Sequence, residues 1–253
     1  MNRYGFFTLY RKEVMRFLKV SVQTVLAPVI SAMLYLMIFS HLLEERLEVY
    51  PGISYGTFLV PGLVMMSMIQ NAFANSSSSL IQSKMAGNIV FVLLAPISAL
   101  EFFAAFTLAA ISRALMVGVG VALVAAFFVE VTVPHPVWAL VFSVLGAAFL
   151  GVLGIVAGIS AEKYEHLAAF QNFVILPLSF LSGVFYSIHS LPGTWAAVSR
   201  FNPFFYIIDG FRYGFVGASD ISPWTSLAVT SAFLVGVTAI TIYLLNRGYK
   251  LRK

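Results

Sequence analysis

Lysine, histidine and acidic side chains are the residues of this chain that could support catalysis, but their spacing fits no catalytic motif. None of the lysines stands in the G-x-x-x-x-G-K-[ST] pattern that cradles the phosphates of a nucleotide. The four histidines are scattered, without the H-E-x-x-H spacing or a comparable cluster that holds zinc. Cysteine is absent, which excludes thiolate sites and disulfides. We therefore expect no catalytic residue, no metal site and no cofactor in this chain.

A single arginine within an apolar segment is the clearest sign of a specialised polar site. Arg113 lies about twelve residues into the run that begins near Glu101, or about 18 Å along a helix. A charge near the middle of a bilayer costs about 2.5 kcal/mol or more, so this guanidinium must face protein or water. Two roles stay open, a hydrogen-bonded structural pin and a residue that lines a translocation path. The candidate partners are amides of neighbouring segments: Gln70, Asn71, Asn75, Gln171 and Asn172.

The composition predicts that lipid surrounds most of the chain. Of its 253 residues, 60% are hydrophobic and 10% are charged, and the mean hydropathy is +0.93. A soluble domain is typically about 25% charged. The apolar segments follow one another with short polar gaps, so residues 1–253 are predicted to form one all-α integral membrane domain.

Six apolar segments approach or exceed the length of about 20 residues that a helix needs to cross a bilayer. Residues 187–215 are also apolar but contain Pro192-Gly193 and Asn202-Pro203, so we expect short re-entrant helices there, at the outer face. The first segment is too long for the apolar core of a signal peptide, and we expect it to be retained. The six predicted spans are residues 20–40, 55–75, 101–129, 137–160, 167–186 and 224–245.

The distribution of Lys and Arg predicts the orientation of the chain. If the amino terminus is cytoplasmic, three basic residues fall on the outer side, namely Arg46, Arg200 and Arg212. Basic residues are enriched in cytoplasmic loops, so both termini are predicted to be cytoplasmic. The inner side then carries eleven: Arg3, Arg11, Lys12, Arg16, Lys19, Lys84, Lys163, Arg247, Lys250, Arg252 and Lys253.

Residues 4–19 are predicted to form a basic amphipathic helix at the inner interface. Their apolar residues recur at three- and four-residue spacing and so share one helical face, while Lys12, Arg16 and Lys19 fall on the opposite face. The helix could simply anchor the first span or could also help to receive a cytoplasmic partner. The predicted apolar face comprises Phe7, Tyr10, Val14 and Phe17.

A stripe of small residues runs along the fourth predicted span. Gly151, Gly154 and Gly158 recur at three- and four-residue spacing, and small residues let helices approach closely in lipid. The pattern favours packing within one subunit, and a subunit interface is the alternative.

The connection of residues 78–96, between the second and third predicted spans, is too long for a turn. The charge distribution puts it on the cytoplasmic side, and Pro96 closes it just before the third span. We expect a short helix on the inner surface, which can press into a groove on a soluble partner.

Several motifs together resemble the type-2 ABC transporter permeases, and specifically the YadH-type bacterial inner-membrane permeases. The resemblance covers nearly the whole chain. It is strongest at Phe58-Leu59-Val60-Pro61-Gly62-Leu63-Val64-Met65-Met66-Ser67, Leu93-Leu94-Ala95-Pro96-Ile97, Ser182-Gly183-Val184-Phe185-Tyr186-Ser187, Leu191-Pro192, Phe201-Asn202-Pro203 and Gly210-Phe211-Arg212-Tyr213-Gly214-Phe215.

The resemblance implies an exporter permease without a nucleotide site of its own. In such permeases the segment between spans two and three is a coupling helix. Relatives often carry acidic residues where this chain has Val90 and Phe91, so we expect a more apolar contact, with Phe91 as its anchor. The alternative is that Phe91 anchors the helix in the lipid interface. The candidate coupling residues are Lys84, Gly87, Asn88, Phe91, Leu94 and Pro96.

The resemblance also implies the partners. Two permease subunits would form a homodimer in the bacterial inner membrane and would bind two separate ATPase subunits, which hold the ATP and Mg. The lipid bilayer is the remaining partner, and no nucleic acid is expected to bind. The alternative function is a channel or secondary carrier without an ATPase, which would need charge rings or a proton relay in the membrane. The residues do not identify a substrate among drugs, glycans and lipid-linked molecules.

Overall fold

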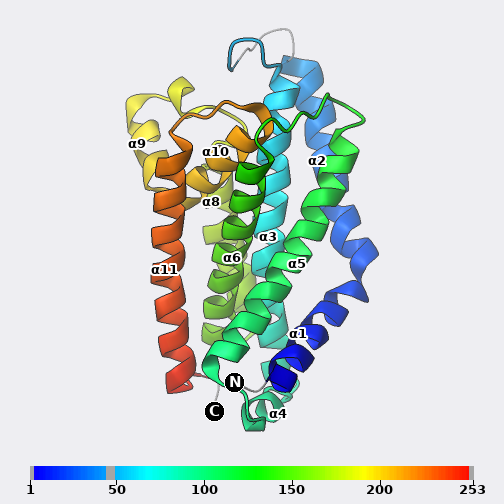
Figure 1. Ribbon diagram of the computed structural model, residues 1–253, viewed down its shortest axis with the longest axis vertical. Coiled ribbons are helices and arrows are strands. Elements are labelled where there is room, and N and C mark those ends of the chain that lie inside the picture. The colour runs from blue at the N-terminus through cyan, green and yellow to red at the C-terminus, as the bar shows by residue number, and fades with distance from the viewer. Residues whose placement is uncertain (1–2, 44–48, 251–253) are drawn as a thin grey trace.

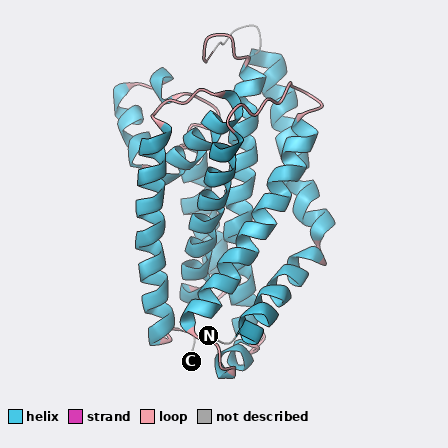
Figure 2. Ribbon diagram, viewed as in Figure 1, coloured by secondary structure: helices cyan, strands magenta, loops and turns pink. Residues whose placement is uncertain are grey.

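The computed structural model describes residues 3–43 and 49–250, and it shows a bundle of helices joined by loops, without a β-sheet in these ranges (Figure 1, Figure 2). The predicted all-helical membrane class is confirmed. Arg46, Arg252 and Lys253 of the predicted charge distribution lie outside the described residues. Five helices in the described ranges are long and apolar enough to cross a membrane: α2 (Ser21–Leu43), α3 (Tyr55–Met85), α5 (Ala99–Ala125), α6 (Pro136–Ser160) and α11 (Pro223–Arg247).

The predicted fifth span, residues 167–186, is not one regular helix. It is built from α7 (Tyr164–Phe170), a π-helical turn (Gln171–Ile175) and α8 (Leu176–Phe180). Pro177 lacks the backbone N–H that a regular helix would use, and Gly183 adopts a left-handed φ of 75° in the turn that follows. The chain is therefore helical only as far as Phe180 in this region.

The remaining helices lie at the two ends of the bundle (Figure 1). One end carries α1 (Arg3–Leu18), α4 (Ile89–Leu94) and the last turn of α11. The opposite end carries α9 (Gly193–Phe201) and the top of α10 (Pro203–Val216), preceded by a 3₁₀ turn at Ile188–Ser190. We refer to these as the α4 end and the α9 end.

Helix α3 is the core of the bundle. In its most apolar stretch 78% of the residues are buried, against 17% in α2 and 11% in α11. It also continues ten residues past the predicted end at Asn75. Ser76, Ser77 and Ser79 are buried in this continuation, so the serine run beyond the predicted span is part of the core. The first part of the predicted 78–96 connection is thus the end of α3, and its separate short helix is α4.

The glycine stripe of α6 packs against neighbouring helices of the same chain. A Cβ atom added at Gly154 would lie 2.5 Å from the carbonyl oxygen of Phe73 in α3. One added at Gly158 would lie 2.7 Å from Cβ of Leu80. The glycines thus allow α6 to approach the backbone of α3, as expected for packing within one subunit.

Helix α1 is present, but its predicted apolar face is only partly correct, because Phe17 is buried and Tyr10 packs half-buried against the bundle. The face that packs on the bundle contains Leu9, Glu13 and Phe17, whereas Phe7 is 60% exposed. Burial of Glu13 is tolerated because its carboxylate accepts hydrogen bonds from Lys12 at 2.9 Å and Arg16 at 3.3 Å. A pattern based on hydrophobicity places charged residues on the exposed side and so cannot anticipate a buried ion pair.

At the α9 end, the carboxylates of the half-buried Asp220 and the buried Asp209 tie the loops to the helices. Asp220 accepts hydrogen bonds from the hydroxyl of Tyr50 at 2.6 Å and from the backbone N–H of Ile188 at 2.7 Å. Asp209 of α10 accepts from the backbone N–H of Asp220 at 2.7 Å. Arg212, which the charge distribution assigned to the outer side, is completely buried in α10 with its guanidinium 4.0 Å from the centre of the Phe58 ring. This end is therefore held together by polar contacts.

Candidate functional site

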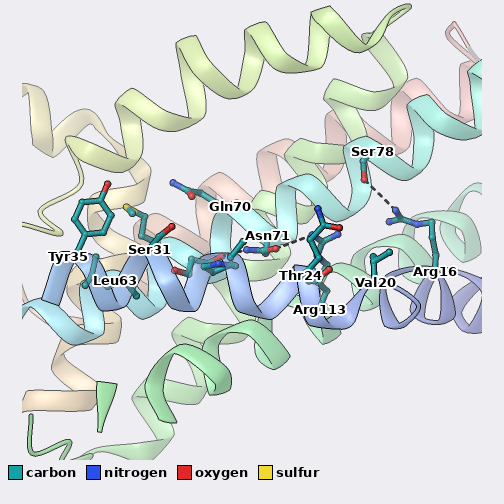
Figure 3. Close-up of a pocket in the computed structure, with 16 residues that line it drawn as sticks. Arg16, Val20, Thr24, Ser31, Tyr35, Leu63, Gln70, Asn71, Ser78 and Arg113 are labelled. Carbon is teal, nitrogen blue, oxygen red and sulfur yellow. Dashed lines mark hydrogen bonds between the residues drawn. The ribbon is translucent and has the colours of Figure 1, made fainter. Parts of the chain in front are cut away.

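A polar cavity of about 560 Å³ lies between α2 and α3, with contributions from α1 and α5 (Figure 3). Most of its wall belongs to the helices that are apolar enough to cross a membrane. It is lined by Arg16, Val20, Gln23, Thr24, Ala27, Pro28, Ser31, Ala32, Tyr35, Leu63, Met66, Ser67, Gln70, Asn71, Ser78 and Arg113.

Arg113 of α5 reaches this cavity and bonds to α3. Its Nη2 donates to Oδ1 of Asn71 at 3.0 Å. Nδ2 of Asn71 donates in turn to the carbonyl oxygen of Ser67 at 3.1 Å, which keeps Oδ1 turned toward the arginine. Nε of Arg113 and Nε2 of Gln70 are both buried without an acceptor among the described residues. The site therefore holds donors that the described protein leaves unused.

Arg16 enters the same cavity from α1 and is firmly bonded. Its Nη2 donates to the backbone oxygen of Asn75 at 2.7 Å and to Oδ1 of the same residue at 2.9 Å, and its Nε bonds to Glu13. These bonds join α1 to the middle of α3. Asn75 is therefore linked to the cavity by its hydrogen bonds with Arg16.

The other two amide candidates lie elsewhere. Gln171 and Asn172 belong to the π-helical turn after α7, and neither lines the cavity. The structure thus brings together Gln70, Asn71 and Arg113, with Asn75 next to them.

The sequence prediction missed the contribution of α2 to this site. Thr24, Ser31 and Tyr35 of α2 line the cavity. Their spacings are close to multiples of the helical repeat, so they share one face of α2. Polar residues on one face of an otherwise apolar span were the available signal, and Gln23 belongs to the same group.

The α4 end carries a second candidate site, an apolar surface outside the bundle. Phe91 is 73% exposed and Leu94 is 77% exposed, while Ile89 is buried and anchors α4 to the bundle. Gly87 turns the chain between α3 and α4 with a left-handed φ of 72°. Asn88 at the start of α4 and Pro96 beyond its end are both exposed.

Lys84 lies near α4, but its ammonium group faces the bundle. Nζ donates to the backbone oxygen of Ile159 at 2.8 Å and to that of Ala161, so it caps the carboxyl end of α6. Close by, Lys250 forms an ion pair with Glu162 at 2.8 Å, and this hydrogen bond raises the pKa of Lys250. The contacts of Lys84 fix the carboxyl end of α6 to α3, at the α4 end of the bundle.

Comparison with known proteins agrees with this arrangement. Residues 4–216 match the ABC-2 type transporter family. The chain is 38% identical to the inner membrane transport permease YadH of Escherichia coli K12, over 97% of this chain and 96% of that protein. It is 24% identical to nodulation protein J of Rhizobium meliloti, over 97% of this chain and 94% of that protein.

The matched family supplies the membrane subunit of an ABC transporter and lacks a nucleotide-binding domain. The match begins in α1 and ends with α10, so it contains both candidate sites. The identity to YadH extends over nearly the full length of both proteins, so the two chains are similar as a whole and not in one segment alone. The chain is therefore a multi-pass, inner-membrane permease subunit of the ABC-2 type transporter family.

Proposed function

We propose that this permease forms the translocation path of an ATP-driven exporter and receives its driving force through α4. The observation that carries the proposal is the apolar surface of Phe91 and Leu94, which projects at one end of the bundle. A large aromatic side chain that becomes fully desolvated in a pocket of the partner can act as a binding hot spot. A groove of a separate ATPase subunit, which binds ATP and Mg, would cover them.

The assembly that fits this role is a permease homodimer with two ATPase subunits. One chain offers one α4, and α2 and α11 leave most of their surfaces free for lipid or for a second copy. ATP binding would close the ATPase pair, and the movement would pass through α4 to α3 and α5, the two helices that flank it in the chain. The alternative, a carrier without an ATPase, gains no support from charge rings or proton relays in the described spans.

We further propose six crossings, with α7, the π-helical turn and α8 together forming the fifth, which is shorter than the other five. At 1.5 Å per residue, the 17 residues from Tyr164 to Phe180 span about 25 Å, somewhat less than the hydrocarbon core. Helices α9 and α10 would be re-entrant on the outer side. Helix α1 would lie at the cytoplasmic interface, and both termini would be cytoplasmic.

The topology can be tested with single cysteines, because the chain contains none. Ser54→Cys and Pro134→Cys, both at exposed positions, should react with an impermeant maleimide added from outside the membrane. Lys163→Cys, in the exposed loop before α7, is the matched inner control and should react only after permeabilisation. Labelling of position 54 or 134 only from the cytoplasmic side would overturn the orientation.

The dependence on a separate ATPase can be tested by purification. A tagged permease expressed with its cognate ABC ATPase should retain that subunit after detergent extraction, at a mass of two permeases and two ATPases. ATP hydrolysis should be found in the complex and not in the permease purified without it. Hydrolysis by the permease itself, or a functional monomer without an ATPase, would contradict the proposal.

A further inference from the structure

The cavity between α2 and α3 carries an excess of positive charge. Arg16 and Arg113 line it, and no acidic side chain does so among the described residues. The charge of Arg16 is offset by Glu13, which lies behind it in α1. Arg113 takes part in no ion pair within the described part of the chain. One guanidinium in the membrane region is therefore without a counter-charge.

An uncompensated charge at this depth is costly, so its retention requires compensation. Asn71 supplies one neutral acceptor, which leaves Nε of Arg113 and the amide nitrogen of Gln70 without a described acceptor. Arginine presents several N–H donors in a planar fork that matches the oxygens of a phosphate. An anionic group in the cavity would offset the charge of Arg113.

The cavity is long and changes character along its length (Figure 3). Its α2 wall extends from Gln23 to Tyr35, which is about 18 Å along a helix axis. Figure 3 shows Arg16 at one end, Tyr35 and Leu63 at the other, and Arg113 between them. An elongated occupant with one charged end and a less polar body fits this distribution.

From this geometry we infer that the cavity binds the phosphate group of an amphipathic molecule, with Arg113 as the principal charged contact and Gln70 as a further polar residue of the lining. The inference names a chemical class for the transported molecule and in that respect rests on the proposed function. The binding itself is a property of the permease without the ATPase and is tested separately. The same contacts could hold a free phosphate ion, so the two sources of phosphate need to be compared.

Binding can be measured by isothermal titration calorimetry on the purified permease in a nonionic detergent. The probes are dioctanoyl phosphatidic acid, inorganic phosphate and dioctanoylglycerol, which has the same acyl body without the phosphate. We expect saturable binding of phosphatidic acid and none of dioctanoylglycerol. Saturable binding of inorganic phosphate that depends on Arg113 would support the anion site and would identify its ligand as soluble phosphate.

The decisive variant is Arg113→Gln, which keeps a hydrogen-bonding side chain and removes the charge. It should bind phosphatidic acid at least about tenfold more weakly, whereas Arg113→Lys should retain part of the affinity. Gln70→Ala should weaken the binding of phosphatidic acid several-fold. It is a second test of the site if Arg113→Gln folds poorly. The matched control is Arg200→Gln in exposed α9, which changes the net charge equally and should bind as the wild type does.

Three results would overturn the inference. The first is that neither phosphatidic acid nor inorganic phosphate binds saturably. The second is that the wild type and Arg113→Gln bind the phosphate probe equally. The third is that dioctanoylglycerol binds as tightly as phosphatidic acid. ATPase association is measured on the same preparations. If anion binding fails while the ATPase stays bound, the inference falls and the proposed function stands.

Discussion

Phe91→Ala should weaken the association between permease and ATPase about 30-fold, while the permease remains folded and dimeric. The side chain is 73% exposed, so its truncation removes little packing within the chain. If it fills a pocket of the ATPase, its loss costs about 2 kcal/mol or more, as at other aromatic hot spots, and each 1.4 kcal/mol is a factor of ten. The measurement is the dissociation constant of the detergent-purified complex.

The control for this prediction is Phe127→Ala. Phe127 follows α5 at the opposite end of the bundle and is 87% exposed, so the change in exposed apolar surface is similar. Its substitution should leave ATPase association unchanged. Equal association and equal ATP hydrolysis for both variants would assign Phe91 to the lipid interface, and the coupling contact would then have to involve Asn88 or Leu94.

Gly154→Val should lower the free energy of unfolding by about 3 kcal/mol. A Cβ atom at this position would lie 2.5 Å from the backbone oxygen of Phe73. Backbone atoms cannot move aside as a flexible side chain can, so α6 and α3 would have to separate. Overpacking of a close-packed core costs about 1–3 kcal/mol, and a β-branched residue against backbone belongs at the upper end. The measurement is the thermal unfolding midpoint in detergent.

The matched control is Gly236→Val in α11, where an added Cβ would meet no atom within 4 Å. This variant should unfold at the wild-type temperature or slightly above it, because valine is no worse than glycine in a helix. If the two variants unfold at the same temperature, the close approach of α6 to α3 is not important for stability.

The long helices could be predicted from the sequence because a bilayer-spanning helix must be apolar along its whole length. Pro136–Ser160 and Pro223–Arg247 lie within two residues of the predicted spans. The extension of α3 to Met85 could not be predicted in this way, since Ser76 and Ser77 are polar. Their burial depends on glycines of α6 that are about 80 residues away in the sequence.

The candidate site was predictable in part for a related reason. Arg113 and its possible amide partners follow from the cost of a charge in lipid, and Asn71 is the partner that the structure provides. The involvement of Arg16 depends on how α1 docks against α3 and α5, and that docking relies on the buried carboxylate of Glu13. Hydrophobic periodicity contains no information about such an ion pair. Gln171 and Asn172 were equally good candidates by composition, and only the fold separates them from the cavity.

The most direct test of coupling through α4 is a photocrosslink from residue 91 in intact membranes. A benzophenone amino acid replaces Phe91, the cells are irradiated, and the products are identified by mass spectrometry, with the same substitution at Phe127 as the control. The account predicts an adduct between the permease and the ABC ATPase from position 91 and none from position 127. Adducts from position 91 with lipid only, in membranes that contain the assembled ATPase, would contradict it.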